Sequence, residues 1–534
     1  MEAHYPKYVL YGVLIVGSWL VSSILHFQFF HLSLFSSSRL RGVALLAVDE
    51  PPVPAISLNA SFIGLPENPP ATVVAEDNGA AAACEGRYVY MVDLPSRYDV
   101  LRDCVEGSPE FDKWYSQCTL MSNAGMGPAL PAPTGDGTDG DTGLIGPDAA
   151  GWYNTDQYAL EVIFHNRMRR YPCLTGNPSS ATAVYVPYYP ALELQQHLCG
   201  DTNSDARDRP SSEFIQWLSS QPRWTTLGGR DHFLVASKTT WMFRRLVQQG
   251  AGGEKKNRYC GNNFLDSHPE TANMTVLTYE SNLWSTRRED FAVPYPSYFH
   301  PSSADAVSAW QARVRSAPRR WLFAFAGARR ANGSLPIRDR IIDACAASSR
   351  CGRVDCGEGH GDLEGYITCR TPRRLVSIFG ASRFCLQPRG DSFMRRSSVD
   401  AVMAGCVPVF FHQPSTFKTQ YRWHEPDPEK KINGGDERRY SVLIDADEVM
   451  QGKVDIEEVL GRYTDQEVAA MREEVIKMIP RFLYKDPRVR FDGETRDAFD
   501  IAIDEVLERV RRIKNGEDLG LEDADGQLVV AKDL

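Results

Sequence analysis

The pattern of apolar residues changes at Cys84, where a polar, proline-rich stretch gives way to short apolar runs. Several of these runs are continuous rather than alternating, which is typical of strands buried on both faces of a parallel sheet. We therefore predict buried strands in eight segments: 88–92, 183–189, 233–236, 276–278, 322–326, 384–386, 407–411 and 442–444.

Segments with a helical spacing of apolar residues lie between these strands. Residues 155–171 begin with Thr155, which suits a helix cap, and residues 336–347 begin with Pro336, which suits a first turn. We expect a third helix over 395–405. Strands that alternate with helices indicate an α/β fold. The glycine-rich run 357–361 shows no strand before it and no phosphate-loop spacing, so we expect a plain loop there.

The N-terminal segment has a different character. Residues 8–30 are apolar and carry no acidic side chain, lysine or arginine. About 20 such residues span the hydrocarbon of a bilayer, and no clear signal-peptide cleavage site follows. We predict a cytoplasmic stub at 1–7, a transmembrane signal anchor at 8–30 and a flexible stalk at 31–83 that is rich in Ser, Pro and Ala.

Three prolines near residue 300 interrupt the alternation of strands and helices, and we place a domain junction within 295–318. The expected organisation is one α/β domain at 84–300, a second at 301–515 and an acidic tail at 516–534.

Charge narrows the choice of partners. The chain of 534 residues has 59 Lys and Arg against 69 Asp and Glu, a net charge of −10. An acidic chain is a poor partner for nucleic acid, which needs a basic face. Any anion site must therefore be local.

Cysteines and glycosylation sequons indicate the compartment. All twelve cysteines follow residue 83 and none forms a CxxC pair, so disulfides are favoured over zinc. Three N-x-S/T sequons, at Asn59, Asn273 and Asn332, agree with a lumenal C-terminal bulk. Chance sequons and buried free thiols are the alternative, and the disulfide pairing stays open.

The window 382–411 carries the most informative chemistry, because it reads strand, Pro/Gly turn, helix, Gly, strand. A helix that starts beyond the carboxyl end of a strand suits a diphosphate. Gly390 would allow the backbone to approach the phosphate closely, and Asp400 could bind ribose hydroxyls. Positive charge would come from Arg389, Arg395 and Arg396. A nucleotide-sugar site is one interpretation, and surface ion pairs with a solvated Asp400 are the other.

Two rival motifs are weaker. The triplet Gly390-Asp391-Ser392 resembles the serine block of lipase-like esterases, but no histidine follows in a D-x-x-H arrangement. Asp445 and Asp447 imitate a metal-binding D-x-D, although capping of the helix that follows explains them better. We therefore expect neither a hydrolase nor a metal site.

The chain resembles exostosin-like glycosyltransferases of family 47, and within them the plant xyloglucan galactosyltransferase group. The likeness covers roughly residues 84–507 and rests on blocks in the same order, which are 87–98, 157–175, 184–190, 231–245, 291–301, 323–330, 384–411, 421–424 and 496–501. The resemblance implies two Rossmann-like domains facing across a cleft (GT-B-like), preceded by the membrane helix and stalk. It also implies an inverting mechanism without an essential metal or cofactor.

The same resemblance assigns donor binding to the loop and helix after the strand at 384–386, namely Gly390, Asp391, Ser392, Arg395, Arg396 and Asp400. This sequence departs from the group at Arg389 and at Phe393-Met394, where relatives often carry Pro and smaller polar residues, so an altered donor or a loss of catalysis stays open.

Inversion needs one general base for the acceptor hydroxyl, and we expect it at a strand end of the first domain. Asp93 and Glu280 rank ahead of His165 and His300, and each of the four has an alternative structural role.

The resulting hypothesis is a Golgi enzyme, single-pass type II with a lumenal catalytic part. It would transfer galactose from UDP-galactose to xylosyl side chains of xyloglucan. Another UDP-sugar or a mannan acceptor is the nearest variant. A non-catalytic scaffold or lectin-like subunit of a Golgi complex is the alternative from another class. Other Golgi glycosyltransferases are further expected partners.

Overall fold

The computed structural model describes eleven stretches of the chain, all within one compact unit that spans Ile63–Leu534. The described residues are 84–108, 111, 117–133, 143–196, 204–244, 260–266, 268–281, 290–329, 335–357, 371–426 and 440–517. The predicted anchor and stalk and two of the three sequons, Asn59 and Asn332, lie outside them. Within the described stretches, no helix is both long enough and apolar enough to cross a membrane.

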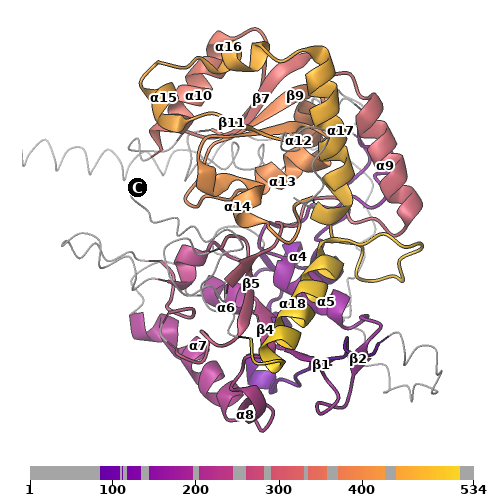
Figure 1. The fold of residues 1–534 in the computed structure, drawn as a ribbon, viewed down its shortest axis with the longest axis vertical. Helices are drawn as coiled ribbons and strands as arrows, with labels where there is room; N and C mark the ends of the chain where they lie inside the picture. Colours follow the sequence, from indigo (N-terminus) through magenta and orange to yellow (C-terminus); the bar gives the residue numbers. More distant parts are fainter. Residues whose placement is uncertain are drawn as a thin grey trace, which may run out of the picture. The chain divides into compact units, whose positions relative to one another are not determined.

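Two parallel β-sheets organise the fold (Figure 1). The first sheet has the order β2 (Leu174–Thr175), β1 (Val89–Met91), β3 (Ala183–Tyr185), β4 (His232–Val235), β5 (Thr275–Thr278) and β6 (Asp290–Ala292). The second sheet has the order β11 (Val442–Leu443), β10 (Val407–Phe410), β9 (Ser382–Gln387), β7 (Trp321–Gly327) and β8 (Cys351–Asp355).

Each of the eight predicted strand segments overlaps a strand, and neighbouring strands in both described sheets are parallel, which confirms the α/β prediction. The residues of β3, β4, β5 and β10 are buried throughout, as their continuous apolar runs predict. Strands β2, β6 and β8 were not predicted. In β8 the side chains of Arg353 and Asp355 are exposed, so this edge strand shows no continuous apolar run. Because β8 ends at Asp355, the expectation that no strand precedes the run 357–361 was wrong.

Helices of the first half connect its strands, and those of the second half follow residue 300. The first group comprises α3 (Val100–Asp103), α4 (Gln117–Leu120), α5 (Leu160–Met168), α6 (Pro190–Gln196), α7 (Ser204–Ser219) and α8 (Trp224–Leu227). The second comprises α9 (Ala304–Ser316), α10 (Pro336–Ala347), α12 (Pro372–Gly380), α13 (Arg396–Met403), α14 (Phe417–Gln420), α15 (Ala446–Met450), α16 (Ile456–Gly461), α17 (Asp465–Phe482) and α18 (Ala498–Lys514).

Two of the three helix predictions are confirmed closely, and one was wrong at its start. The helix predicted over 336–347 is α10, and that over 395–405 is α13. The helix predicted from Thr155 begins only at Leu160, so Thr155 is not its cap. The Asp156 carboxylate accepts from the Tyr158 amide at 2.8 Å, which forms a turn instead of a helix start.

Successive side chains along the central strands pack on opposite faces of the first sheet. Leu234 and Val276 belong to a core cluster with α7 residues such as Phe214. Phe233 and Leu277 belong to a second, larger cluster that continues into the second sheet. Burying one such side chain contributes roughly 1.5–3 kcal/mol, so this shared core ties the two sheets together.

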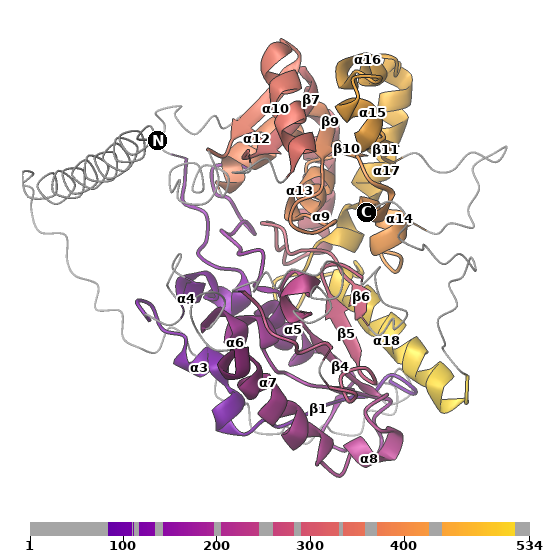
Figure 2. The ribbon, with the colours of Figure 1, turned by 90° about the vertical axis from the view of Figure 1, so that its left-hand side faces the viewer.

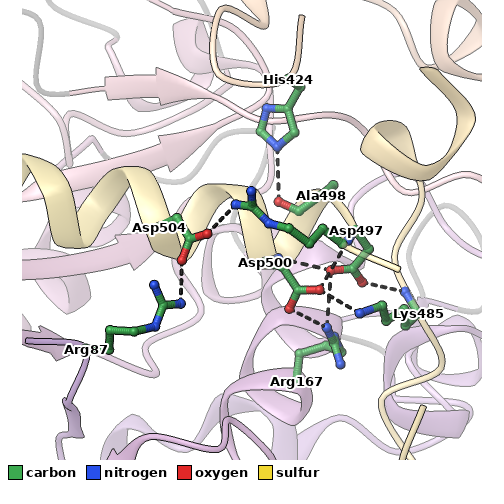
Figure 3. A network of polar contacts seen from close by, with 9 residues as sticks. Arg87, Arg167, His424, Lys485, Asp497, Ala498, Asp500 and Asp504 are labelled. Atoms are coloured by element: carbon green, nitrogen blue, oxygen red, sulfur yellow. Dashed lines mark hydrogen bonds and ion pairs between the residues drawn. The ribbon is translucent and has the colours of Figure 1, made fainter. Parts of the chain in front are cut away.

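Helix α18 is the last helix among the described residues but lies beside the first sheet (Figure 2). The ring of Phe499 in α18 lies 4.6 Å from that of Phe164 in α5. Its first turn holds a polar network, shown in Figure 3. There Arg167 of α5 bridges Asp497 at 3.2 Å and Asp500 at 3.1 Å, and Lys485 bonds Asp500 at 2.6 Å. The network fixes where the returning chain meets α5.

Disulfides confirm the oxidised state predicted for the cysteines. The structure pairs Cys84–Cys173, Cys104–Cys118, Cys345–Cys351 and Cys385–Cys406. Cys260 and Cys356 are disulfide-bonded as well. The last of the four pairs closes a loop that contains the end of β9 and all of α13.

Candidate active site

The second sheet has a topological switch point between β7 and β9. The chain passes from β7 to β8 on one side and then returns to β9, β10 and β11 on the other. Open α/β sheets bind ligands beyond the carboxyl ends of the strands at such a point. The segment 388–395 follows β9 directly, so the predicted donor residues of this loop lie at the switch point.

Arg395 lies across this switch point. Its Nη2 donates to the carbonyl of Ala326 in β7 at 3.2 Å, and its Nη1 donates to the carbonyl of Pro388 after β9 at 3.4 Å. These contacts hold the guanidinium between the two strand ends. The positive charge that the sequence placed here is therefore held by protein carbonyls next to the expected diphosphate position.

Gly390 packs between two arginines. A Cβ atom at this residue would lie 3.2 Å from Nη2 of Arg338 and 3.7 Å from Cγ of Arg395. Arg338 is buried in the first turn of α10, the helix that follows β7. Arg338 was not among the residues predicted from the sequence, although its place in the first turn of the predicted helix 336–347 was an available signal. Gly390 therefore serves the close packing of arginine side chains, and its amide donates to the Ser392 carbonyl at 2.9 Å.

Arg396 and Asp400 of α13 contact the first half of the chain. The Arg396 guanidinium lies 3.6 Å from the ring centroid of Tyr298 and donates to the Thr155 carbonyl at 2.6 Å. Asp400 accepts from the Ser297 hydroxyl at 2.8 Å, and its Oδ2 lies 3.7 Å from Nε of Arg396. Burial raises the pKa of Asp400, and Arg396 opposes that shift.

The assigned donor residues thus fall into two groups. Gly390 and Arg395 lie at the switch point, whereas Arg396 and Asp400 join α13 to residues before 301. Two guanidinium nitrogens of Arg396, Nε and Nη2, are buried without a hydrogen-bond partner among the described residues. Asp391 is exposed, and the Ser392 hydroxyl donates to the Met394 carbonyl at 3.1 Å.

The first sheet has its own switch point between β1 and β3. Asp93 follows β1 by two residues and has an exposed side chain. An exposed carboxylate at a switch point is open to a substrate, as a general base must be. Among the four base candidates, Asp93 combines an exposed carboxylate with a position at the switch point.

Glu280 follows β5 by two residues and is buried. Its Oε1 accepts from the amide and hydroxyl of Thr240 at 3.3 and 3.0 Å, and its Oε2 accepts from the Phe393 amide at 3.2 Å. Burial raises the pKa of Glu280, while the hydrogen bonds from Thr240 and Ser392 lower it. This carboxylate of the first half therefore contacts the loop after β9.

The two histidine candidates lie in structural positions, His300 buried and His165 half-buried. His165 hydrogen-bonds the Tyr189 hydroxyl through Nδ1. His300 bonds the Tyr484 carbonyl through Nδ1 at 2.8 Å and the Thr155 hydroxyl through Nε2 at 2.9 Å. Burial lowers the pKa of each histidine to about 4, so both are neutral at pH 7.

Sequence reasoning also missed Glu161 and Lys238 at the carboxyl edge of the first sheet. Glu161 of α5 accepts from the amides of Ala191, Leu192 and Ser237 at 2.9, 3.3 and 2.9 Å. Burial raises its pKa to about 8. Lys238 donates to Gln195 at 2.9 Å. A glutamate within the apolar run of residues 159–164 was the available signal.

Two further predictions concern individual surface positions. Asp445 caps α15 by accepting from the amides of Asp447 and Glu448 at 2.9 and 3.0 Å, which confirms the capping interpretation. Asn273 is exposed, and its side-chain amide donates to the Gly228 carbonyl at 3.0 Å.

The exostosin GT47 domain matches residues 83–460 of this chain. The chain therefore belongs to the exostosin GT47 family of glycosyltransferases, which confirms the resemblance inferred from the sequence blocks.

The chain is similar to several family members from Arabidopsis thaliana, of which three are described. The chain is 40% identical to xyloglucan galactosyltransferase MUR3 over 433 residues, which is 81% of this chain and 63% of that protein. It is 38% identical to probable xyloglucan galactosyltransferase GT12, covering 81% of this chain and 78% of the relative. It is 33% identical to xyloglucan-specific galacturonosyltransferase 1, covering 80% of this chain and 58% of that protein. The chain thus spans just under two thirds of the length of MUR3.

Proposed function

We propose that this protein is an inverting glycosyltransferase that transfers galactose from UDP-galactose to xylosyl side chains of xyloglucan. The observation that carries the proposal is the pair of arginines, Arg338 and Arg395, at the switch point of the second sheet. Guanidinium groups bind diphosphates well. The names of relatives at about 40% identity supply the sugar and the acceptor.

The proposed mechanism divides the work between the two sheets, as in a GT-B-like enzyme with two Rossmann-like domains across a cleft. The second sheet would hold the UDP moiety, with Arg395 and the start of α13 stabilising negative charge on the leaving diphosphate. The first sheet would present the acceptor. Asp93 would take the proton of the acceptor hydroxyl as the sugar is attacked opposite the diphosphate.

A second donor is favoured by one specific comparison. The relative at 33% identity is named a xyloglucan-specific galacturonosyltransferase. A galacturonosyl group differs from a galactosyl group by a carboxylate at C6, which needs a cationic partner. Arg389 offers such a charge in the loop 388–395 after β9, which we call the donor loop. Its guanidinium carbon lies 5.7 Å from the ring centroid of Phe393.

We further propose the Golgi lumen as the site of action, with residues 8–30 as a type II anchor. The disulfides of the described residues support an oxidising compartment. The exposed Asn273 supports glycosylation at that sequon.

We also propose that transfer needs no divalent metal, and that the diphosphate charge is met by arginines instead. The use of Asp445 as a helix cap supports this proposal. Activity should persist when a chelator is present. Activity that a chelator abolishes and manganese restores would return Asp445 and Asp447 to the list of metal ligands.

The deciding experiment measures UDP release by the full-length protein with UDP-galactose, UDP-galacturonic acid and other UDP-sugars against xyloglucan and mannan oligosaccharides. We expect release with UDP-galactose and xyloglucan, and a mass increase of one hexose on the acceptor. Preference for UDP-galacturonic acid would select the second donor. Binding of UDP without any turnover would favour a scaffold, and no binding of UDP at all would overturn the proposal.

A further inference from the structure

Glu280 contacts the donor loop in a way that a free base would not. Both oxygens of its carboxylate accept hydrogen bonds from protein donors, one from Thr240 and one from the Phe393 amide. The Ser392 hydroxyl and the Met394 amide also face the carboxylate and lower its pKa. A base needs an oxygen open to the acceptor hydroxyl. Glu280 is only 6% exposed, so neither carboxylate oxygen is open in this way.

The donors around Glu280 come from two parts of the chain. Thr240 follows β4 in the first half, whereas Phe393 and Met394 belong to the loop after β9. The carboxylate therefore joins the first sheet to the donor loop through backbone amides. Backbone amides at a turn beyond a strand are also the groups that bind phosphate in such folds.

The loop residues that receive this contact are themselves packed. Phe393 and Met394 are 8% and 2% exposed. Arg395 follows immediately and spans the switch point through the carbonyls of Ala326 and Pro388. Fixing the amides of residues 393 and 394 thus fixes the backbone from which Arg395 extends.

We propose that Glu280 is a positioning residue for the donor site: its carboxylate, supplied by the first sheet, holds the loop 388–395 in the conformation that places Arg395 across the switch point. This inference rests on the proposed function for its effect on catalysis. Its structural part, the hold on the loop, stands without any donor.

The first test needs no ligand. Hydrogen–deuterium exchange of the full-length protein reports on the amides of the peptide that covers 388–395. A hydrogen bond to a charged group is worth about 1.5–3 kcal/mol, which corresponds to about tenfold to a hundredfold. In Glu280→Gln we expect the amides of residues 393 and 394 to exchange faster by about that factor. Glu473→Gln is the matched control, because its carboxylate pairs with Arg315 on the surface. Equal exchange in both variants and the parent overturns the proposal.

The second test separates positioning from base catalysis. A positioning role predicts that Glu280→Gln weakens UDP binding about tenfold or more by calorimetry, and that the pH–rate profile keeps both of its limbs. A base role predicts unchanged UDP affinity, a turnover loss of about 10²–10⁴ and the disappearance of the limb assigned to the base. The second pattern overturns the proposal.

Two milder variants keep the test decisive if Glu280→Gln does not fold. Glu280→Asp keeps the charge but shortens the reach to the loop by one methylene group. Thr240→Val removes the hydroxyl that accounts for the 3.0 Å bond to Oε1. We expect both to raise exchange in 388–395 and to lower UDP affinity, each by less than Glu280→Gln. Unchanged exchange in both overturns the proposal. A parent protein that binds no UDP would refute the proposed function, while the exchange result would still decide the role of Glu280.

Discussion

The carboxyl edges of the two sheets have the same backbone architecture and opposite side-chain chemistry. We call the residues Arg338, Gly390 and Arg395 beyond β7 and β9 the arginine edge. We call Asp93, Glu161 and Glu280 around the ends of β1, β3, β4 and β5 the carboxylate edge. Both edges lie at or beside a switch point of a parallel sheet.

The comparison shows that the switch point sets where a ligand can bind and the residues after the strands set which ligand it is. Guanidinium groups suit a diphosphate, and carboxylates suit an acceptor hydroxyl that must lose a proton. The carboxylate edge is itself divided. Asp93 is exposed, whereas the carboxylates of Glu161 and Glu280 accept hydrogen bonds from backbone amides and hold loops in place.

The largest expected effect comes from the exposed member of the carboxylate edge. Asp93→Asn should lower turnover about 10²–10⁴-fold and leave UDP affinity unchanged, because it removes a proton acceptor that does not touch the donor. Steady-state rates and calorimetry with UDP measure the two quantities. Asp103→Asn, an exposed residue of the same half, is the control. Full turnover in Asp93→Asn would mean that the base lies elsewhere.

The arginine edge should respond in the opposite way. Arg395→Ala should weaken UDP binding about tenfold to a hundredfold, because it removes a charge-assisted contact. Melting temperature should change less, and this measurement shows whether the fold survives. Arg462→Ala is the control, since that arginine pairs with Glu458 at the surface. Unchanged UDP affinity in Arg395→Ala would remove the donor site from the second sheet.

Two disulfides sharpen the contrast between the halves. Cys385–Cys406 and Cys104–Cys118 close loops of sequence separation 21 and 14, so removing either should cost about 3 kcal/mol of unfolding free energy. Only the loss of Cys385–Cys406 should also weaken UDP binding, because that loop contains α13 and the donor loop. Double serine variants of each pair, compared by chemical unfolding and calorimetry, test this. An equal loss of UDP affinity in both would indicate a general loosening.

Acidification should test the structural role of the two histidines with lowered pKa values. His165 and His300 have pKa values lowered to about 4 by burial, whereas an unfolded chain has about 6.5. Between these values the unfolded state binds more protons, so stability falls as pH falls from about 6.5 towards 4. The loss at pH 5 is about 2 kcal/mol per histidine. His300→Gln should flatten the dependence of unfolding free energy on pH, and an unchanged slope would contradict this.

The fold was predictable wherever local pattern decides structure. Continuous apolar runs revealed the central strands, and Pro336 marked the start of α10. Three of the four edge strands of the described sheets, β2, β6 and β8, were not predicted. In β8 the exposed Arg353 and Asp355 interrupt the apolar run. The start of α5 escaped too, since the Asp156 turn displaces the helix start from Thr155 to Leu160.

The candidate site was predictable in part. The loop and helix after β9 could be located from the strand–turn–helix reading of 382–411. Partners far apart in the chain could not. The contacts of Glu280 with Phe393 and of Asp400 with Ser297 join residues more than 100 positions apart, and no periodicity encodes such pairs.

Because α18 packs beside the first sheet, the part of the protein that is synthesised first completes its folding last. The strands of the first sheet are synthesised early, but the helix that packs Phe499 against Phe164 is the last one described. During synthesis the apolar face of α5 stays exposed to solvent until residue 514 has left the ribosome. Aggregation competes with folding during this period. The sheet translated first is therefore completed last, and shortening the chain from its C-terminal end would damage its N-terminal half.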